Sequence, residues 1–346
     1  MTRLRYFGVV FAVLYCLAVD ADGVNDSAHS SAYERGVSYA KKGDRSLAEA
    51  AFLEASKDLQ AAPDAYFQLA WLSIGSSEWQ KAENWIRQFL KARPVSEQGL
   101  YLLGYVLFRQ GEYERAEKTL RDLLQENPEN VEGHKILGLV YFQLQRKDEA
   151  QTQLRSVVRL NPRLAEGHYL LGRLLYDLNS FIEARQCFVA AIDLEPQFMK
   201  AFDNLGLTLD ALGEAQQAIK VFHKAIELNE SLKIDSKWPY LNLGEVLLKQ
   251  NQYFQSIPYF RKALAIDPNW AKAHSSLGKA LVREGKNEEA KASFLTAIRL
   301  DAASSDAHYQ LGQLYRKQGD MESARQELKL FQQLKNESST LALSAP

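Results

Sequence analysis

Four of the six histidines in this 346-residue chain stand in register, which makes them the first candidates for chemistry. His134 and His168 are 34 residues apart, and so are His274 and His308. Imidazole is a common zinc ligand, and each ligand must approach the ion to about 2 Å. A constant interval between histidines also arises when they occupy the same packing position in successive repeats. The elements that carry the histidines decide between these two interpretations.

Those elements repeat every 34 residues along the chain. The twentieth position of each row is alanine in eight rows and Ser256 in the other, and the twenty-fourth is phenylalanine, isoleucine or leucine. Small side chains at a fixed position are typical of two helices that cross closely. The eighth position is small in every row: Gly36, Ala70, Gly104, Gly138, Gly172, Gly206, Gly244, Gly278 and Gly312.

Within each row, apolar residues recur three or four apart, which indicates amphipathic helices. Glycines such as Gly111 and Gly213 break the row near its middle, where a helix is expected to end. Prolines such as Pro128 and Pro162 close it, because proline cannot continue a helix. Each row is therefore predicted to be a helix, a turn and a second helix.

The chain resembles the tetratricopeptide repeat family in its row length, Leu-Gly pair, alanine and closing proline, over residues 29–336. The resemblance implies an all-α, right-handed α-α superhelix of about nine hairpins, whose first helices line a concave groove. A single hairpin cannot bury its apolar face, so we expect the stability to come from the stacking of neighbouring hairpins. We expect a longer helix or a loop near Ser231 to Ser236, a kinked or delayed helix at Pro258, and a tail over 337–346. Rows begin near 29, 63, 97, 131, 165, 199, 237, 271 and 305.

The N-terminus predicts export to the periplasm or the extracellular space. Arg3 and Arg5 precede an apolar stretch over residues 6–19, which is typical of a secretory signal peptide ending near residue 21. This stretch is short for a membrane-spanning helix. An uncleaved membrane anchor is the alternative, and residues 22–28 are interpreted as a linker.

Composition and motifs argue against several classes of function. With 42 basic and 43 acidic residues, the chain has no excess of positive charge with which to bind nucleic acid. We also expect no membrane contact beyond the N-terminal signal. No nucleophile elbow, phosphate loop or metalloprotease helix occurs, so we expect no enzyme, catalytic residue or cofactor. The histidines occupy the fourth position of their rows, where other rows have bulky residues such as Tyr66 and Phe202. A packing role for the histidines is therefore favoured over a metal site.

The first helices carry a stripe of side chains that would face the groove, at positions two, five, nine and twelve of each row. The stripe is rich in aromatic residues in rows two to five, and mostly polar or charged in rows six to nine. Aromatic side chains dominate binding hot spots, although stacking between neighbouring helices would also explain them. The predicted peptide-binding residues are Phe67, Trp71, Tyr101, Tyr105, Phe108, Phe142, Tyr169, Arg173, Tyr176, Asn204, Asn242 and Lys272.

The leading hypothesis is a non-enzymatic scaffold that binds a protein or peptide segment in its groove. A subunit of an envelope or secretion assembly is the second hypothesis, with contacts through the convex face or the C-terminal repeat, where self-association is also expected. The third is a saccharide-binding or glycosyl-transfer-associated module, because aromatic stripes also stack on sugar rings. The sequence leaves the identity of the partner open.

Overall fold

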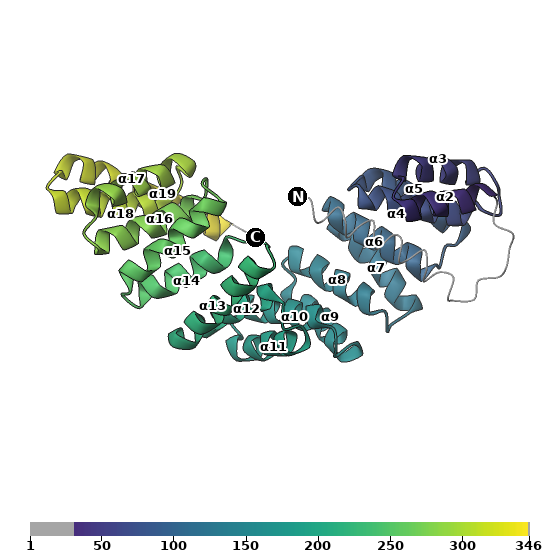
Figure 1. The fold of residues 1–346 in the computed structure, drawn as a ribbon, viewed down its shortest axis with the longest axis horizontal. Coiled ribbons are helices and arrows are strands. Elements are labelled where there is room, and N and C mark those ends of the chain that lie inside the picture. Colours follow the sequence, from purple (N-terminus) through teal and green to yellow (C-terminus); the bar gives the residue numbers. More distant parts are fainter. Residues whose placement is uncertain (1–30, 345–346) are drawn as a thin grey trace. The chain divides into compact units, whose positions relative to one another are not determined.

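The computed structural model describes residues 31–344, and this part of the chain is entirely α-helical, with eighteen helices and no strand (Figure 1). The predicted signal peptide and linker lie outside the described residues. The helices are α2 (Ser31–Lys42), α3 (Arg45–Ala55), α4 (Ala62–Gly75), α5 (Trp79–Ala92), α6 (Glu97–Gln110), α7 (Tyr113–Glu126), α8 (Val131–Gln143), α9 (Lys147–Leu160), α10 (Ala165–Asp177), α11 (Phe181–Leu194), α12 (Met199–Ala211), α13 (Ala215–Ser231), α14 (Trp238–Lys249), α15 (Tyr253–Ile266), α16 (Ala271–Arg283), α17 (Asn287–Leu300), α18 (Ser305–Gln318) and α19 (Met321–Ser344).

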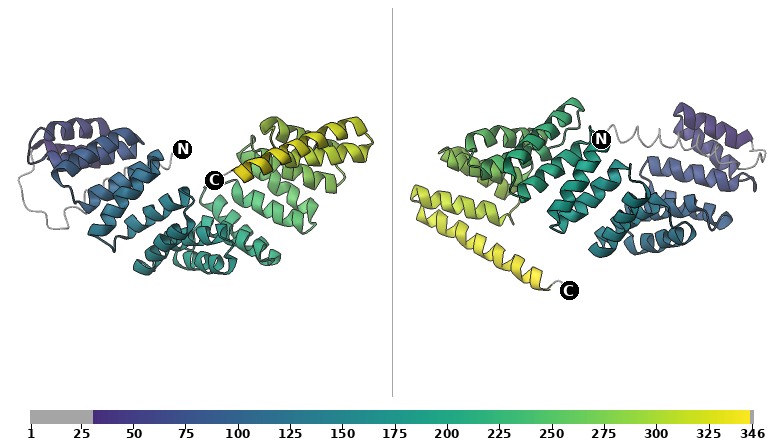
Figure 2. Two further views of the ribbon diagram at one scale, coloured as in Figure 1. Left: turned by 180° about the vertical axis from the view of Figure 1, so that it is seen from behind. Right: turned by 90° about the horizontal axis from the view of Figure 1, so that it is seen from below.

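The chain divides into two compact units, an N-terminal unit up to Arg163 and a C-terminal unit from Leu164. In each unit the helices form successive hairpins, and each hairpin packs against the next (Figures 1 and 2). The all-α solenoid class predicted from the sequence is therefore confirmed.

The glycine column marks the place where the two helices of a hairpin meet. A Cβ atom added at Gly206 would lie 2.6 Å from a ring carbon of Phe222, and one at Gly104 would lie 2.6 Å from Leu120. Real carbon atoms in contact are separated by about 3.5–4.0 Å. In each of the eight hairpins with glycine at position eight, the second helix thus places the residue at position 24 directly over that glycine.

The turn inside each hairpin needs one residue in the left-handed region, at position fifteen of the row. Gly111 (φ 82°) and Gly319 (φ 86°) hold this place as the sequence predicts, but Ser77, Gln145 and Asn251 hold it in other rows with φ 60°. A side chain in this conformation costs about 1–2 kcal/mol. Proximity of the two helices therefore sets the turn even where glycine is absent.

The extra residues between the sixth and seventh rows lengthen a helix and add a loop, as expected. Helix α13 has 17 residues, and a loop follows before α14. Asn229, which is only 3% exposed, donates to the Ser236 carbonyl and accepts from the Ser236 amide, both at 2.9 Å. This pair of bonds closes the loop back onto the end of α13.

Two details differ from the sequence-based expectations. Helix α15 begins at Tyr253 and includes Pro258, so the proline does not delay the start of the helix. Helix α19 continues to Ser344, past residue 336, where the array was expected to end and a tail to begin (Figure 2). The last hairpin therefore has a second helix much longer than its first.

Candidate functional site

The histidines in register link successive hairpins to one another. The Nε2 atoms of His134 and His274 each lie 2.9 Å from the carbonyl oxygen of the proline that closes the preceding row, Pro128 and Pro268 respectively. His308 makes the equivalent contact with Ala302 at 3.2 Å. Within the described residues there is no cluster of three or more His, Cys, Asp or Glu side chains that could hold a metal ion. The recurrent imidazole thus serves as a hydrogen-bonding group between repeats.

The clearest surface feature of the N-terminal unit is an aromatic cluster on α5 and α6, formed by Trp79, Tyr101, Tyr105 and Arg109. The rings of Tyr101 and Tyr105 stack with centroids 6.4 Å apart, and Trp79 meets the Tyr105 ring edge-on at 6.3 Å. Arg109 lies over Trp79 at 4.4 Å and donates to the Tyr105 hydroxyl at 2.7 Å. We call these four residues the aromatic cluster.

All three rings of the aromatic cluster are partly exposed, and the Arg109 side chain is exposed. The stripe pattern identified Tyr101 and Tyr105 but missed Trp79, which begins the second helix of the preceding row. It also missed Arg109, whose only sequence signal is its place four residues after Tyr105 on the same helix. The cluster is thus assembled from two hairpins.

Of the other predicted residues in the N-terminal unit, Phe67 is buried and three are partly exposed but stacked on neighbouring rings or half-covered. Phe67 is 5% exposed and packs on Phe89 with ring centroids 5.1 Å apart, so it belongs to the core. Trp71 meets the edge of Phe67, and Phe108 packs on Tyr113. Trp71, Phe108 and Phe142 are half-buried. Stacking therefore accounts for part of the aromatic stripe.

In the C-terminal unit, two tyrosines of α10 are half-buried against phenylalanines. Tyr169 packs on Phe198 with centroids 4.9 Å apart, and Tyr176 packs on Phe181 at 5.4 Å. Burial raises the pKa of both phenols above the usual value. Arg173 is exposed and extends over the Tyr169 ring at 5.9 Å. Arg173 is therefore the most exposed of these three side chains.

The polar stripe of the C-terminal unit is largely occupied by contacts between neighbouring first helices. Lys249 pairs with Asp210 at 2.6 Å, and Lys272 lies 3.4 Å from Glu245. Lys279 pairs with Asp306 at 2.7 Å. Asn204 donates to the Lys200 carbonyl on its own helix. Many of the polar groups that the sequence suggested for a ligand are thus engaged within the protein. Arg316, at position twelve of the ninth row, forms no ion pair within the described residues and lines a hollow together with Arg283 and Lys317, which lie off the stripe.

One buried carboxyl group on this stripe makes stability dependent on pH. Asp203 of α12 is 8% exposed and accepts a 2.9 Å hydrogen bond from the Asn242 amide of α14. Burial raises the pKa of Asp203 from 3.8 to about 6, although the bond from Asn242 opposes the rise. Because the folded pKa exceeds the unfolded one, the stabilisation is full below about pH 4 and is lost as the pH rises through 6.

Second helices in the N-terminal unit are joined by ion pairs that the repeat pattern does not reveal. The Glu83 side chain of α5 is 2% exposed and pairs with Arg115 of α7 and with Arg87 of its own helix. Burial alone would raise its pKa, but hydrogen bonds from Gln110 and Arg115 hold the pKa below the usual value. One hairpin further on, Glu117 of α7 pairs at 2.7 Å with Arg146, which lies just before α9. These pairs hold adjacent hairpins together.

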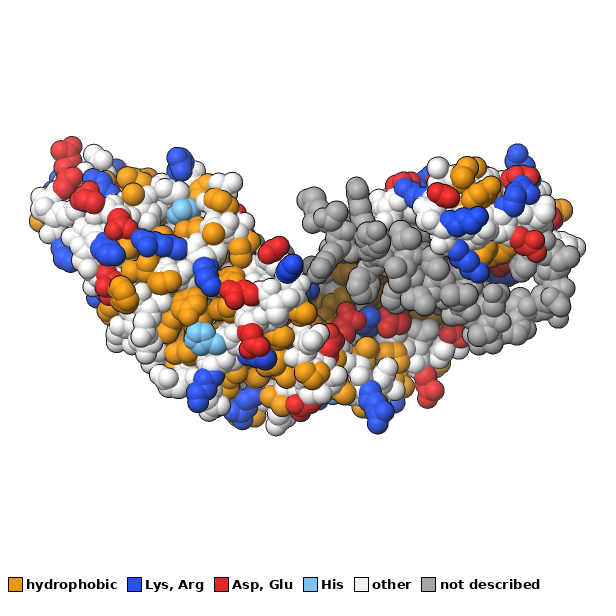
Figure 3. All heavy atoms as spheres, viewed as in Figure 1, with side chains coloured by type: hydrophobic (Ala, Val, Ile, Leu, Met, Phe, Trp, Pro, Cys, Tyr) orange, Lys and Arg blue, Asp and Glu red, His pale blue; other side chains and the backbone are white. Residues whose placement is uncertain are grey.

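The surface in the viewed direction mixes both signs of charge with hydrophobic side chains (Figure 3). A surface of this kind does not present the continuous basic face expected of a nucleic-acid-binding protein. No helix in the described part of the chain combines the length and the apolar character needed to cross a bilayer.

Fold and surface together define a class of protein, a helical-hairpin solenoid that supports interactions with other proteins. Tetratricopeptide repeat models match residues 137–196, 198–269, 278–319 and 305–337. A model described as anaphase-promoting complex, cyclosome, subunit 3 matches residues 75–157. The chain belongs to the tetratricopeptide repeat family, as its resemblance predicted.

Solved structures agree with this fold. A tetratricopeptide repeat protein from Parabacteroides merdae is 20% identical, with a TM-score of 0.58 over 73% of this chain and 98% of its own. The pilF protein of Pseudomonas aeruginosa is 22% identical, with a TM-score of 0.54 over 61% of this chain and 94% of its own. No curated protein matches the sequence. At these identities the likeness concerns the fold.

Proposed function

We propose that this protein is a non-catalytic scaffold that binds a polypeptide segment on the exposed face of its first helices. The observation that carries the proposal is the aromatic cluster. It places two tyrosines, a tryptophan and an arginine, residue types enriched in binding hot spots, at one partly exposed site.

The side chains of the aromatic cluster are held in place before any ligand arrives. Arg109 is fixed both by the Trp79 ring and by the Tyr105 hydroxyl, so it loses little rotamer freedom on binding. Ordering a long side chain at an interface otherwise costs about 0.5–1.5 kcal/mol. A preorganised surface with large apolar area and one fixed cation suits a peptide side chain and its backbone carbonyl.

The test is capture of the native partner by the full-length protein. The protein is crosslinked in its source cells, purified, and the bound material is identified by mass spectrometry. Tyr105→Ala combined with Arg109→Ala should reduce the recovered polypeptide at least tenfold, the loss expected when a hot-spot pair is truncated.

A matched control removes the same residue types from outside every proposed site, as Tyr39→Ala with Arg159→Ala. Circular dichroism melting checks that both double variants fold. Equal recovery of the polypeptide with both folded variants would refute the proposal. Recovery of a glycan in place of a polypeptide would instead support a saccharide-binding module.

A second candidate function, a subunit of a larger assembly, is favoured by a hollow on the second-helix face of α13 and α15. Phe254 is 71% exposed there, and the hollow is lined by Ile219, Pro258 and Tyr259. Exposed apolar side chains gathered in this way are typical of protein interfaces. We therefore expect Phe254→Ser to disrupt any native complex, including self-association through the C-terminal hairpins, and gel filtration of native extracts would show it.

The site of action proposed for either function is outside the cytoplasm. The proposal rests on the N-terminal pattern of Arg3, Arg5 and the following apolar stretch. N-terminal sequencing of the protein from a fractionated culture tests it, because a retained Met1 would contradict cleavage and a cytoplasmic fraction would contradict export.

A further inference from the structure

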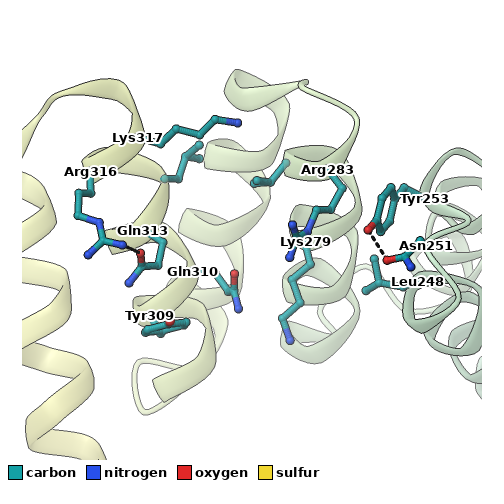
Figure 4. A pocket seen from close by; sticks show the side chains of 12 residues that line it. Leu248, Asn251, Tyr253, Lys279, Arg283, Tyr309, Gln310, Gln313, Arg316 and Lys317 are labelled. Atoms are coloured by element: carbon teal, nitrogen blue, oxygen red, sulfur yellow. Dashed lines mark hydrogen bonds between the residues drawn. The ribbon is translucent and has the colours of Figure 1, made fainter.

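A basic hollow of about 680 Å³ lies on the first-helix face of the C-terminal unit (Figure 4). Its walls come from α14 with the following turn, from the first residue of α15, and from α16 and α18. Four cationic side chains line it, Lys279, Arg283, Arg316 and Lys317, and no carboxylate is among the lining residues. We call this site the basic hollow.

Three of these cations lack the charge partner that others on this face possess. Lys249, Lys272 and Lys279 each pair with a carboxylate of a neighbouring first helix. Over the residues that the structure describes, Arg283, Arg316 and Lys317 form no ion pair.

The two arginines make only weaker contacts. Arg316 donates to the Gln313 amide oxygen, and Arg283 lies over the Tyr253 ring at 6.0 Å. Three cationic side chains around one hollow, none of them paired with a carboxylate, attract an anion that enters it.

The remaining wall residues favour a polypeptide over a small anion. Asn251, Gln310 and Gln313 offer amides that can bond to a peptide backbone, and Tyr253 and Tyr309 supply apolar contact area. The volume falls within the range of about 300–1,000 Å³ usual for sites that enclose whole ligands, far more than one carboxylate fills. The net charge of -1 argues against nucleic acid.

We propose that the basic hollow binds an acidic polypeptide segment, with Arg283, Arg316 and Lys317 pairing with its carboxylates. The inference rests on the proposed function, since it names the chemistry of a segment held on the same first-helix face. A side-chain carboxylate and a chain-terminal carboxylate are chemically alike, so the test separates them.

The probes are three fluorescent twelve-residue peptides that alternate alanine with glutamate, glutamine or lysine, all with blocked ends. A fourth glutamine–alanine peptide has a free C-terminus. Fluorescence anisotropy with the full-length protein measures each Kd, at low salt and again at about 0.5 M salt, where the Debye length is only a few ångströms. We expect the glutamate peptide to bind at least tenfold more tightly than the glutamine or lysine peptide, with binding weakened by salt.

The test variant is Arg283→Gln with Lys317→Gln, which keeps a polar, unbranched side chain at both positions and removes two charges. The control is Arg159→Gln with Lys220→Gln, which removes one arginine and one lysine that are exposed elsewhere. The test variant should bind the glutamate peptide about tenfold more weakly or worse, because two charge-assisted hydrogen bonds are lost. The control should leave the Kd within about twofold, since distant exposed charges are screened.

Equal binding of the glutamate and glutamine peptides, or equal losses in the two variants, would overturn the inference. Tighter binding of the free-ended peptide than of the blocked glutamate peptide would assign the hollow to a chain terminus and overturn the acidic-segment assignment. A single-stranded oligonucleotide that outcompetes the glutamate peptide would also overturn it. Partner capture that depends on Tyr105 and Arg109 reports on the proposed function separately, so either idea can fail alone.

Discussion

The substitution Gly278→Ala tests the packing rule that holds every hairpin together. A Cβ atom at residue 278 would lie 2.5 Å from Cε1 and 2.7 Å from Cδ1 of Phe294, whose side chain is fully buried. Normal contact requires about 3.5 Å, so the ring must move by about 1 Å within a closed core. Overpacking of this kind costs about 3 kcal/mol at its upper end, and alanine recovers about 1 kcal/mol over glycine in a helix. We expect a net loss of about 2 kcal/mol.

The second row contains the compensating pair and therefore supplies the rescue. It has alanine at position eight and isoleucine at position 24, Ala70 and Ile86, both fully buried. Phe294→Ile alone should cost about 1 kcal/mol through lost contacts. Combined with Gly278→Ala, it should recover most of the loss, with a coupling energy of about 2 kcal/mol in a double-mutant cycle.

Urea titration followed by circular dichroism measures this cycle, using midpoints and slopes because stacked repeats need not unfold in one step. Gly75→Ala is the control, since a Cβ atom there meets no atom within 4 Å. It should be neutral or slightly stabilising. A Gly278→Ala protein as stable as the parent, or a double variant that loses the sum of the single losses, would refute the reasoning.

Three further outcomes follow from the described contacts. In urea titrations, the free energy of unfolding of the parent should fall by up to about 3 kcal/mol between about pH 4 and 6 as buried Asp203 ionises, whereas that of Asp203→Asn should stay constant over this range. Parallel pH profiles of the two proteins would exclude this carboxyl as the cause. Gln145→Gly should increase the stability measured in thermal melts by about 0.5–1 kcal/mol, because glycine adopts a positive φ without strain. Gly111→Ala should decrease the stability by about 1 kcal/mol for the same reason. The opposite order of stabilities would contradict this explanation of the turn. Glu83→Gln should cost about 1–2 kcal/mol at pH 7 in urea titrations, because the ionised carboxylate pairs with Arg115. That deficit should shrink as the pH falls through the lowered folded pKa, and a deficit independent of pH would rule out charge pairing.

Repeat architecture was predictable because it depends on spacing within single helices. The period of 34, the small residues at position eight and the bulky ones at position 24 indicated hairpins, and the contact of Gly206 with Phe222 is the close approach that this column required. The histidines were predictable for the same reason, since a residue at one register position meets the same neighbours in every hairpin. His134 and His274 accordingly make the same bond to a closing proline.

What the stripe could not predict is which of its members face outward. A helical period defines one face, but exposure depends on how far the neighbouring hairpins cover it. Phe67 and Asn242 lie on the expected face and are nevertheless buried between adjacent hairpins. Trp79 lies off the stripe and completes the aromatic cluster from another helix.

The sequence by itself determined the helices, their pairing into hairpins and the family. Tertiary structure alone decided which charges are satisfied and which remain available. Lys279 and Arg283 are one turn apart on α16, yet only Lys279 meets a carboxylate, because Asp306 is placed beside it by the next hairpin. Local spacing specifies a repeat, whereas a binding surface arises from side chains that stacking brings together.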